Sequence, residues 1–219
     1  MKNKLTPEQI KENWDALLSC IDRYIPQPRK DKLLSFYERH ELRLGMMPAS
    51  HKKGYHSCFE GGYVFHVLNV LRFSLQLHKI WKLSGSGMET YTLEELAFSA
   101  INHDLGKMGT EDQEAYTPSG DKWRMDKLGE MYEYNNKIPF MTVPDRSIFL
   151  LHQEGIELSM NEFLAIKLHD GLYDKSNEQY LLTYMPEKRP RTALVYILHM
   201  ADMLASRKEF EEDWLAKLE

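Results

Sequence analysis

The pair His103-Asp104 could do chemistry, because an adjacent imidazole nitrogen and carboxylate oxygen can bind one metal cation. A dipeptide by itself is a weak signal. Three further features strengthen it here. Lys107 lies three residues after Asp104. An apolar segment before the pair contains a lone histidine, His66, and an apolar segment much later in the chain contains Asp202. Together these residues predict a metal site built from elements that are distant in the sequence.

His66 and Asp202 extend the pair into a site. His66 falls in the first turns of the most apolar helix expected, and Asp202 is almost the only acid in the apolar segment 193–204. Burying either side chain costs free energy unless a partner satisfies it. The alternative for His66 is a core histidine with ordinary hydrogen-bond partners. The alternative for Asp202 is a position on the solvent-exposed face of an amphipathic helix.

With His103 and Asp104, these residues supply two imidazoles and two carboxylates from three helices, a set that suits manganese, iron, nickel, cobalt or zinc better than calcium or magnesium. A second cation is a further expectation. His169 ends one apolar helix and His152 ends the short helix before it, and Asp104 would bridge the two ions. The other histidines have no metal-like context and are expected to be structural or surface groups: His40, His51, His56, His78 and His199.

The elements that must position these residues are predicted to be helices, so the expected fold class is all-α. Capping boxes begin three of them, at Thr6, Thr92 and Ser159, where a hydroxyl and a Glu or Gln three residues later satisfy free backbone N–H groups. Pro26 and Pro28 separate the first two helices. Asp145 is expected to cap a short helix. Helices are expected over 7–24, 29–44, 62–81, 92–103, 145–151, 159–169 and 191–208.

The segment 107–143 is polar and aromatic and has no helical period. A turn at 119–121, between Tyr116 and Trp123, predicts a small β-hairpin within this long insertion. The aromatic faces of Tyr116, Trp123 and Tyr132 could stack on a nucleobase. The alternative is that they form the hairpin's own small core.

Length, hydrophobic content and net charge limit the classes of protein to which this chain can belong. A chain of 219 residues with 42% hydrophobic content can form one well-packed unit, here an N-terminal helical extension over 1–50 that packs on a main domain over 51–219. The formal net charge of -5 argues against a nucleic-acid scaffold and leaves small anionic substrates open. No apolar run approaches the ~20 residues that span a bilayer, and the N-terminus lacks a signal-peptide core. Cys20 and Cys58 are expected to stay thiols, so we expect a cytoplasmic protein without a membrane partner.

Four short motifs, in a characteristic order, resemble the HD-domain metal-dependent phosphohydrolase superfamily. They are Gly61-Gly62 with His66, the run His103-Asp104-Leu105-Gly106-Lys107, Leu168-His169, and Leu198-His199-Met200-Ala201-Asp202. The nearer likeness is to bacterial and phage HD proteins, a branch that includes HD-domain exoribonucleases and relaxase-associated HD domains. The resemblance covers roughly 55–207. It implies that 51–219 is an all-α catalytic domain with one or two divalent transition-metal ions, which hydrolyses a phosphate ester, usually in a nucleotide.

One position departs from this pattern. Proteins of this branch commonly have Gly-His just before the helix that is expected here near Asp145, whereas this chain has Val143-Pro144. A usual ligand of the second metal is therefore missing, and His152 lies two turns further on. Both a one-metal and a two-metal site stay open.

The resemblance also implies roles for single side chains. Asp104 would orient the attacking water, and Lys107 would contact a phosphate oxygen. Arg189 and Arg191 flank Pro190 at the start of the last helix, where backbone N–H groups favour anions, so they could bind a second phosphate or a nucleic-acid backbone. A charged surface loop is the alternative.

The expected substrate is a small anionic phosphate ester, in the first place a nucleotide, with a short oligonucleotide as the second option. Two other functions stay open. A minority of HD-like proteins use two irons to activate oxygen, which requires a complete second metal site. The chain could also be a non-catalytic module that binds a metal or a nucleotide.

Overall fold

The computed structural model describes residues 5–85 and 90–215 of the chain. These ranges contain ten α-helices, four short 3-10 helices and one pair of strands, so the predicted all-α fold class with a small hairpin is confirmed. In chain order the elements are α1 (Pro7–Tyr24), α2 (Arg29–Arg39), α3 (Glu41–Met46), α4 (Gly62–Leu83), α5 (Leu93–Asn102), η1 (Leu105–Met108), β1 (Tyr116–Pro118), α6 (Lys122–Leu128), β2 (Tyr132–Tyr134), α7 (Val143–Gln153), α8 (Met160–Leu168), η2 (Gly171–Tyr173), η3 (Lys175–Asn177), α9 (Glu178–Leu181), η4 (Pro186–Lys188) and α10 (Leu194–Leu215).

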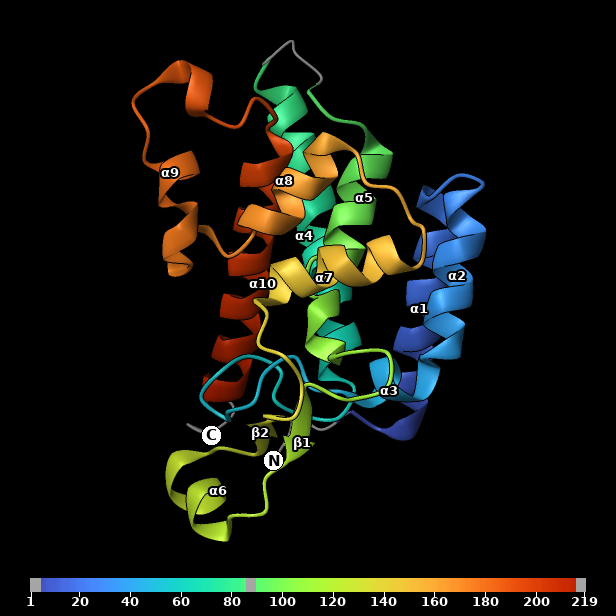
Figure 1. Cartoon of the computed structure of the whole chain (residues 1–219), viewed down its shortest axis with the longest axis vertical. Helices are drawn as coiled ribbons and strands as arrows, with labels where there is room; N and C mark the ends of the chain where they lie inside the picture. Colours follow the sequence, from blue (N-terminus) through green and yellow to red (C-terminus); the bar gives the residue numbers. More distant parts are fainter. Residues whose placement is uncertain (1–4, 86–89, 216–219) are drawn as a thin grey trace.

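The two longest helices, α4 and α10, pack against each other at the centre of the bundle. α5 packs on α4, and α8 packs on both α10 and α5. α7 crosses the bundle and contacts η1, as Figure 1 shows. The hydrophobic core surrounds the two central helices, which contribute fully buried side chains such as Val67, Val70, Leu198 and Ala201.

Three helices begin where the sequence predicts. Thr6, Thr92 and Ser159 each accept a hydrogen bond from the backbone N–H three residues later, and the Gln or Glu at that position bonds back. α7 starts earlier than predicted, because Thr142 is its cap in place of Asp145. α10 begins at Leu194 instead of residue 191 and continues further, to residue 215.

The predicted helix over 29–44 is two helices in the structure. The backbone leaves helical geometry at His40, with φ -107° and ψ 16°, so α2 ends one residue before it and α3 begins one residue after it. The segment 171–188 also holds η2, η3, α9 and η4, which were not predicted. Each of these is too short to show a helical period in the sequence.

The first three helices share the core of the later ones. Leu17, Ile21, Leu33 and Tyr37 are fully buried in the same hydrophobic cluster as side chains of α4 and α5. The Tyr37 hydroxyl also donates to the carbonyl oxygen of Ile101 in α5 at 3.2 Å. In Figure 1, α1 and α2 lie along one side of the bundle.

The hairpin has a different connection from the one predicted. β1 pairs antiparallel with β2, with Tyr116 opposite Tyr134. The predicted turn at 119–121 instead begins α6, because the Asp121 carboxylate caps it by accepting the N–H of Arg124. Trp123, expected as the partner of Tyr116, therefore lies on α6 with 61% of its surface exposed.

Two further expectations concern the whole chain. No helix in the described ranges combines the length and the apolar character needed to cross a bilayer. Neither Cys20 nor Cys58 forms a disulfide within the described residues, as expected.

Arg29 fixes α2 to α5 and α8. Its guanidinium donates two hydrogen bonds to the fully buried Glu162 carboxylate, both at 2.8 Å, and a third to Glu94 at 2.8 Å. It also lies 4.2 Å from the centre of the Phe98 ring. This residue therefore joins the N-terminal helices to the body of the bundle.

We expect Arg29→Ala to lower the free energy of unfolding by about 3 kcal/mol, because the substitution leaves the Glu162 carboxylate buried without its cation. Urea denaturation followed by circular dichroism measures the change. Lys11→Ala, which removes an ion pair with Asp15 on the exposed surface of α1, is the matched control and should change stability little. Equal effects of the two substitutions would contradict this role for Arg29.

Candidate metal centre

Five of the predicted ligands come together in the middle of the bundle. α4 carries His66 in its second turn, His103 and Asp104 follow the end of α5, His169 follows the end of α8, and Asp202 lies within α10. The three histidines are at most 1% exposed and Asp104 is 3% exposed. We call these five residues the metal cluster.

The ligand atoms of the metal cluster face one another. Nε2 of His66 lies 3.1 Å from Oδ1 of Asp202 and 3.6 Å from Oδ2 of Asp104. Nε2 of His103 lies 3.5 Å from the same Oδ2, and Nε2 of His169 lies 3.6 Å from Oδ1 of Asp104. Two sets of ligand atoms within 4.8 Å of one another could each hold an ion: His66, His103 and Asp202, and His103, Asp104 and His169.

Hydrogen bonds on the far side of each ring fix which nitrogen faces the cluster. Nδ1 of His103 and Nδ1 of His169 each donate to the backbone carbonyl oxygen three residues earlier, at 2.9 and 2.8 Å. Nδ1 of His66 donates to the Glu209 carboxylate at 3.2 Å. Because these partners can only accept, Nδ1 carries the hydrogen and Nε2 of each neutral ring keeps its lone pair. Nε2 is therefore the atom of each ring that faces the cluster and that a metal ion would bind.

The Nε2 atoms of His66 and His103 are buried and make no hydrogen bond within the described residues. The short distance from His66 to Asp202 does not have the direction of a hydrogen bond. A buried polar atom without a partner is costly, and a cation bound at these atoms would remove the cost. The residues thus fit a metal ion.

The electrostatics favour a cation as well. Burial alone would lower the pKa of His66, but the carboxylates of Glu209 and Asp202 outweigh it and raise the pKa to about 10. The pKa of His169 rises to about 9, against the effect of burial, because Asp170 and Asp104 face it. The carboxylates therefore hold protons on the histidines, and a metal ion bound here would replace those protons.

The two aspartates of the cluster stay ionised. Burial would raise the pKa of Asp104, yet the neighbouring Lys107 and His103 hold it well below its usual range. The pKa of Asp202 is also lowered in spite of burial, chiefly by His66. Ionised carboxylates are the form that binds a metal.

Glu209 is a functional residue that the sequence analysis missed, because it lies in a charged stretch that reads as solvated. Its side chain is 1% exposed and accepts hydrogen bonds from Ser57 Oγ at 2.6 Å and from Asn69 Nδ2 at 2.9 Å, besides the bond from His66. The sequence does contain a signal for Glu209. It follows Asp202 by seven residues, which is two helical turns, so both residues lie on the same face of α10.

We expect Glu209→Gln to weaken metal affinity by about 10–100-fold, because the ring orientation and basicity of His66 depend on this carboxylate. Titration with Mn²⁺ against a chromophoric chelator measures the affinity. Glu211→Gln, which changes an exposed glutamate on the same helix, is the matched control and should leave the affinity unchanged. The same loss in both variants would contradict the role of Glu209.

The turn after His103 is held by the start of α7. Ser147 Oγ accepts the N–H of Gly106 at 2.8 Å and contacts the carbonyl oxygens of His103 and Val143, at 2.9 and 3.0 Å. A Cβ on Gly106 would lie 2.2 Å from the Val143 carbonyl oxygen, so only glycine allows this approach. Buried Arg146 adds a hydrogen bond to the carbonyl of Gly106. Residues of α7 therefore brace the centre, although none of them is a ligand in it.

His152 is not brought to the centre, and it belongs to none of the candidate ligand groups among the described residues. It is exposed in the last turn of α7, nine residues or about 13 Å along the helix from the end that packs on η1. Its end of α7 faces α2 instead, where Lys32 donates to the carbonyl of Gly155 and Arg39 pairs with Glu154.

Arg189 and Arg191 also lie away from the cluster, so the structure gives no support to the predicted phosphate contacts. Both are exposed before α10 begins, and Arg189 donates to the carbonyl of Thr183. From Leu194 to Asp202, α10 rises about 12 Å, which separates the two arginines from the centre.

Two histidines that were expected to be structural or surface groups contact the centre. The ring centres of His56 and His66 are 4.5 Å apart, and His56 could join His66 and Glu209 in a further ligand group. Burial, His66 and Lys107 lower the pKa of His56 to about 3, so its ring is neutral. His199 donates from Nδ1 to the backbone carbonyl of His169 at 2.7 Å and so helps to hold that ligand.

A cavity of about 530 Å³ opens over the metal cluster, a size that accommodates small molecules. Its wall includes Lys107, His56, His169, Asp202 and Tyr116. Lys107 forms a short salt bridge with Asp104 and is only 12% exposed. A candidate cation site, a lysine and an open cavity therefore lie together.

Comparisons with protein-family models, with curated proteins and with solved structures found no match for this chain. What the centre can do therefore follows from its own residues. The donor atoms, their burial and the adjoining cavity together make a candidate metal centre that a small molecule can reach.

We expect His66→Ala to lose most of the metal that the protein retains through purification without chelators, because the substitution removes one of the ligand atoms that face the centre of the cluster. Metal content is measured by mass spectrometry of the purified protein. His152→Ala, on the exposed end of α7, should retain as much metal as the unchanged chain. Equal metal content in the His66→Ala and His152→Ala variants would contradict the role of His66 as a ligand.

Proposed function

We propose that this protein is a metal-dependent phosphohydrolase of the HD-domain superfamily, which hydrolyses a phosphate ester of a nucleotide or short oligonucleotide. The observation that carries the proposal is the convergence of His66, His103, Asp104 and Asp202, whose ligand atoms face one another in the middle of the bundle. These are the residues on which the sequence resemblance rests, in the same order along the chain. Cys20 and Cys58 form no disulfide within the described residues, which supports a reducing, cytoplasmic location as part of the proposal.

The donor set supports a divalent transition metal, such as manganese, iron, nickel, cobalt or zinc. When bound, such an ion would polarise a phosphoryl oxygen and lower the pKa of a water molecule that it holds. A second ion beside the first would be held by His169 and Asp104, because Nε2 of His103 can bind only one ion at a time. The proposal therefore includes one or two ions, and the second would have fewer protein ligands because α7 supplies no histidine.

Two residues have further roles. The Oδ2 atom of Asp104 faces His66 and His103 and its Oδ1 atom faces His169, which supports a role for this carboxylate in orienting the attacking water. Lys107 remains charged, because Asp104 raises its pKa against the effect of burial. Its ammonium lines the cavity and supports a contact with an anionic phosphate oxygen.

The other functions considered from the sequence predict different results. A di-iron oxygenase would consume oxygen when loaded with iron. A non-catalytic module would bind a metal or a nucleotide and release no product. A screen of nucleotides and short oligonucleotides, with manganese, nickel, cobalt and iron added separately, distinguishes these outcomes from hydrolysis.

We expect Asp104→Ala to abolish both metal retention and turnover while the helical content stays the same, because Asp104 faces every histidine of the cluster. Metal analysis measures the retained metal, product release in the screen measures turnover, and circular dichroism measures the helical content. Asp126→Ala, on the exposed surface of α6, is the matched control and should behave as the unchanged chain. Full turnover in Asp104→Ala would overturn the proposed function.

A further inference from the structure

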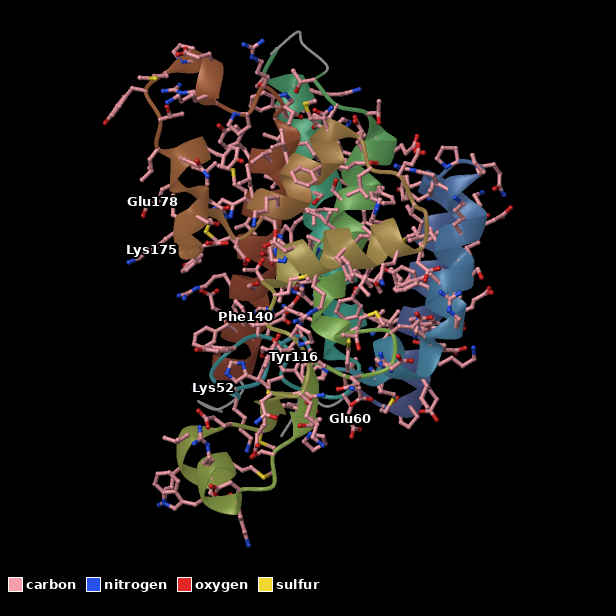
Figure 2. The ribbon with its side chains drawn as sticks, in the orientation of Figure 1. Lys52, Glu60, Tyr116, Phe140, Lys175 and Glu178 are labelled. Carbon is pink, nitrogen blue, oxygen red and sulfur yellow. The ribbon has the colours of Figure 1, made fainter. Side chains whose placement is uncertain are left out.

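The hairpin insertion brings one further polar group to the metal centre. Tyr116 of β1 lines the cavity of about 530 Å³ over the metal cluster, together with Lys107. In Figure 2, Tyr116 lies between the arm that carries α6 and the body of the bundle. The sequence resemblance assigns no role to this insertion, so the role of Tyr116 has to follow from its own contacts.

The hydroxyl of Tyr116 is available to a ligand. The side chain is half-buried, and its oxygen makes no hydrogen bond within the described residues and is not sealed from solvent. Burial raises the pKa of Tyr116, and the charges of Lys107 and Asp104 both act on it. The hydroxyl therefore keeps its proton and lies close to these two groups, on the side of the cavity that they share.

Ring contacts fix the direction of this hydroxyl. The ring of Tyr116 lies nearly parallel to the ring of His51, with an angle of 17° between the planes and 6.1 Å between the ring centres. The ring of Tyr134 meets it edge-on at 6.0 Å. These contacts use the ring for packing, which is the alternative that the sequence analysis gave for the hairpin aromatics. The hydroxyl is the part of Tyr116 that is left for a ligand.

The same contacts tie Tyr116 to the turn that carries Asp104. The Tyr134 hydroxyl accepts a hydrogen bond from Arg146 at 2.9 Å, and Arg146 also donates to the carbonyl oxygen of Gly106 at 3.3 Å. Gly106 lies two residues after Asp104, so the hairpin and the metal cluster share one support. A side chain that packing already holds loses little freedom when it binds a ligand.

Lys107 by itself offers an anion only part of its binding capacity. Its ammonium forms a short salt bridge with the Asp104 carboxylate, so that carboxylate balances its charge and uses one of its donors. A phosphate group presents several acceptor oxygens. A neutral O–H donor beside the ammonium therefore adds a second contact to phosphate without adding a charge to the centre.

We propose that the Tyr116 hydroxyl donates a hydrogen bond to a phosphate oxygen of the substrate beside Lys107, which makes Tyr116 a substrate-binding residue supplied by the hairpin. This inference rests on the proposed function. A hydrogen bond to an ionised acceptor is stronger than one between neutral groups, so its loss weakens phosphate binding. Stacking of the ring on a nucleobase predicts a different result, because phenylalanine in place of tyrosine would preserve the ring.

The first test measures the binding of inorganic phosphate to the full chain, loaded with Mn²⁺ and freed of excess ion, by isothermal titration calorimetry. We expect Tyr116→Phe to weaken the phosphate affinity by about tenfold or more, because only the donor is lost. Tyr132→Phe is the matched control. It removes a hydroxyl from the opposite strand of the hairpin at a residue that does not line this cavity, so the affinity should stay unchanged.

The result for the unchanged chain separates this inference from the proposed function. If the metal-loaded chain binds no phosphate, both proposals fail. If it binds phosphate and Tyr116→Phe binds it equally well, the inference is overturned and the proposed function stands.

A second test separates the hydroxyl from the ring. We expect Tyr116→Phe to keep the metal content and the urea midpoint of the unchanged chain, because the ring makes the contacts with His51 and Tyr134. A weaker phosphate affinity that comes with an equal loss of metal would show a structural role and overturn the inference. Adenosine, which has no phosphate, tests stacking. Weaker binding of adenosine to Tyr116→Ala, with phosphate binding intact, would also overturn it.

Discussion

The structure depends on the burial of a dense group of ionisable side chains inside an apolar helical bundle. Three imidazoles lie against the carboxylates of Asp104, Asp202 and Glu209, where an unpaired charge would be strongly unfavourable. Each charge therefore has a partner of opposite sign or a hydrogen-bond donor. The Nε2 atoms of His66 and His103 are the exception, because they make no hydrogen bond within the described residues, and a bound cation would satisfy both.

Much of the surrounding fold serves to hold these groups in place. Glu209 fixes His66 from two turns further along α10, and backbone carbonyls fix the other two rings. Ser147 and the glycine at 106 hold the turn after His103 against α7. Rigid support of this kind keeps the ligand atoms within reach of one ion, because packed helix ends move less than loops.

The parts that are least regular in sequence shape the access to the centre. The loop before α4 brings His56 and Tyr55 over the metal cluster, and the hairpin brings Tyr116 into the wall of the cavity above it. Neither segment shows helical periodicity. A long insertion in a compact domain often carries function, and here it supplies part of the cavity wall.

Local motifs, and polar residues within apolar helices, leave clear patterns in a sequence. They were enough to predict the helical class, the capped starts of α1, α5 and α8, and the five residues of the metal cluster. The positions of His152, which faces away, of Glu209, which is buried, and of α6, which interrupts the hairpin, could not be predicted, because exposure and contact depend on how the helices pack. A charged residue near a helix end has the same local sequence signature whether it meets solvent or a buried imidazole.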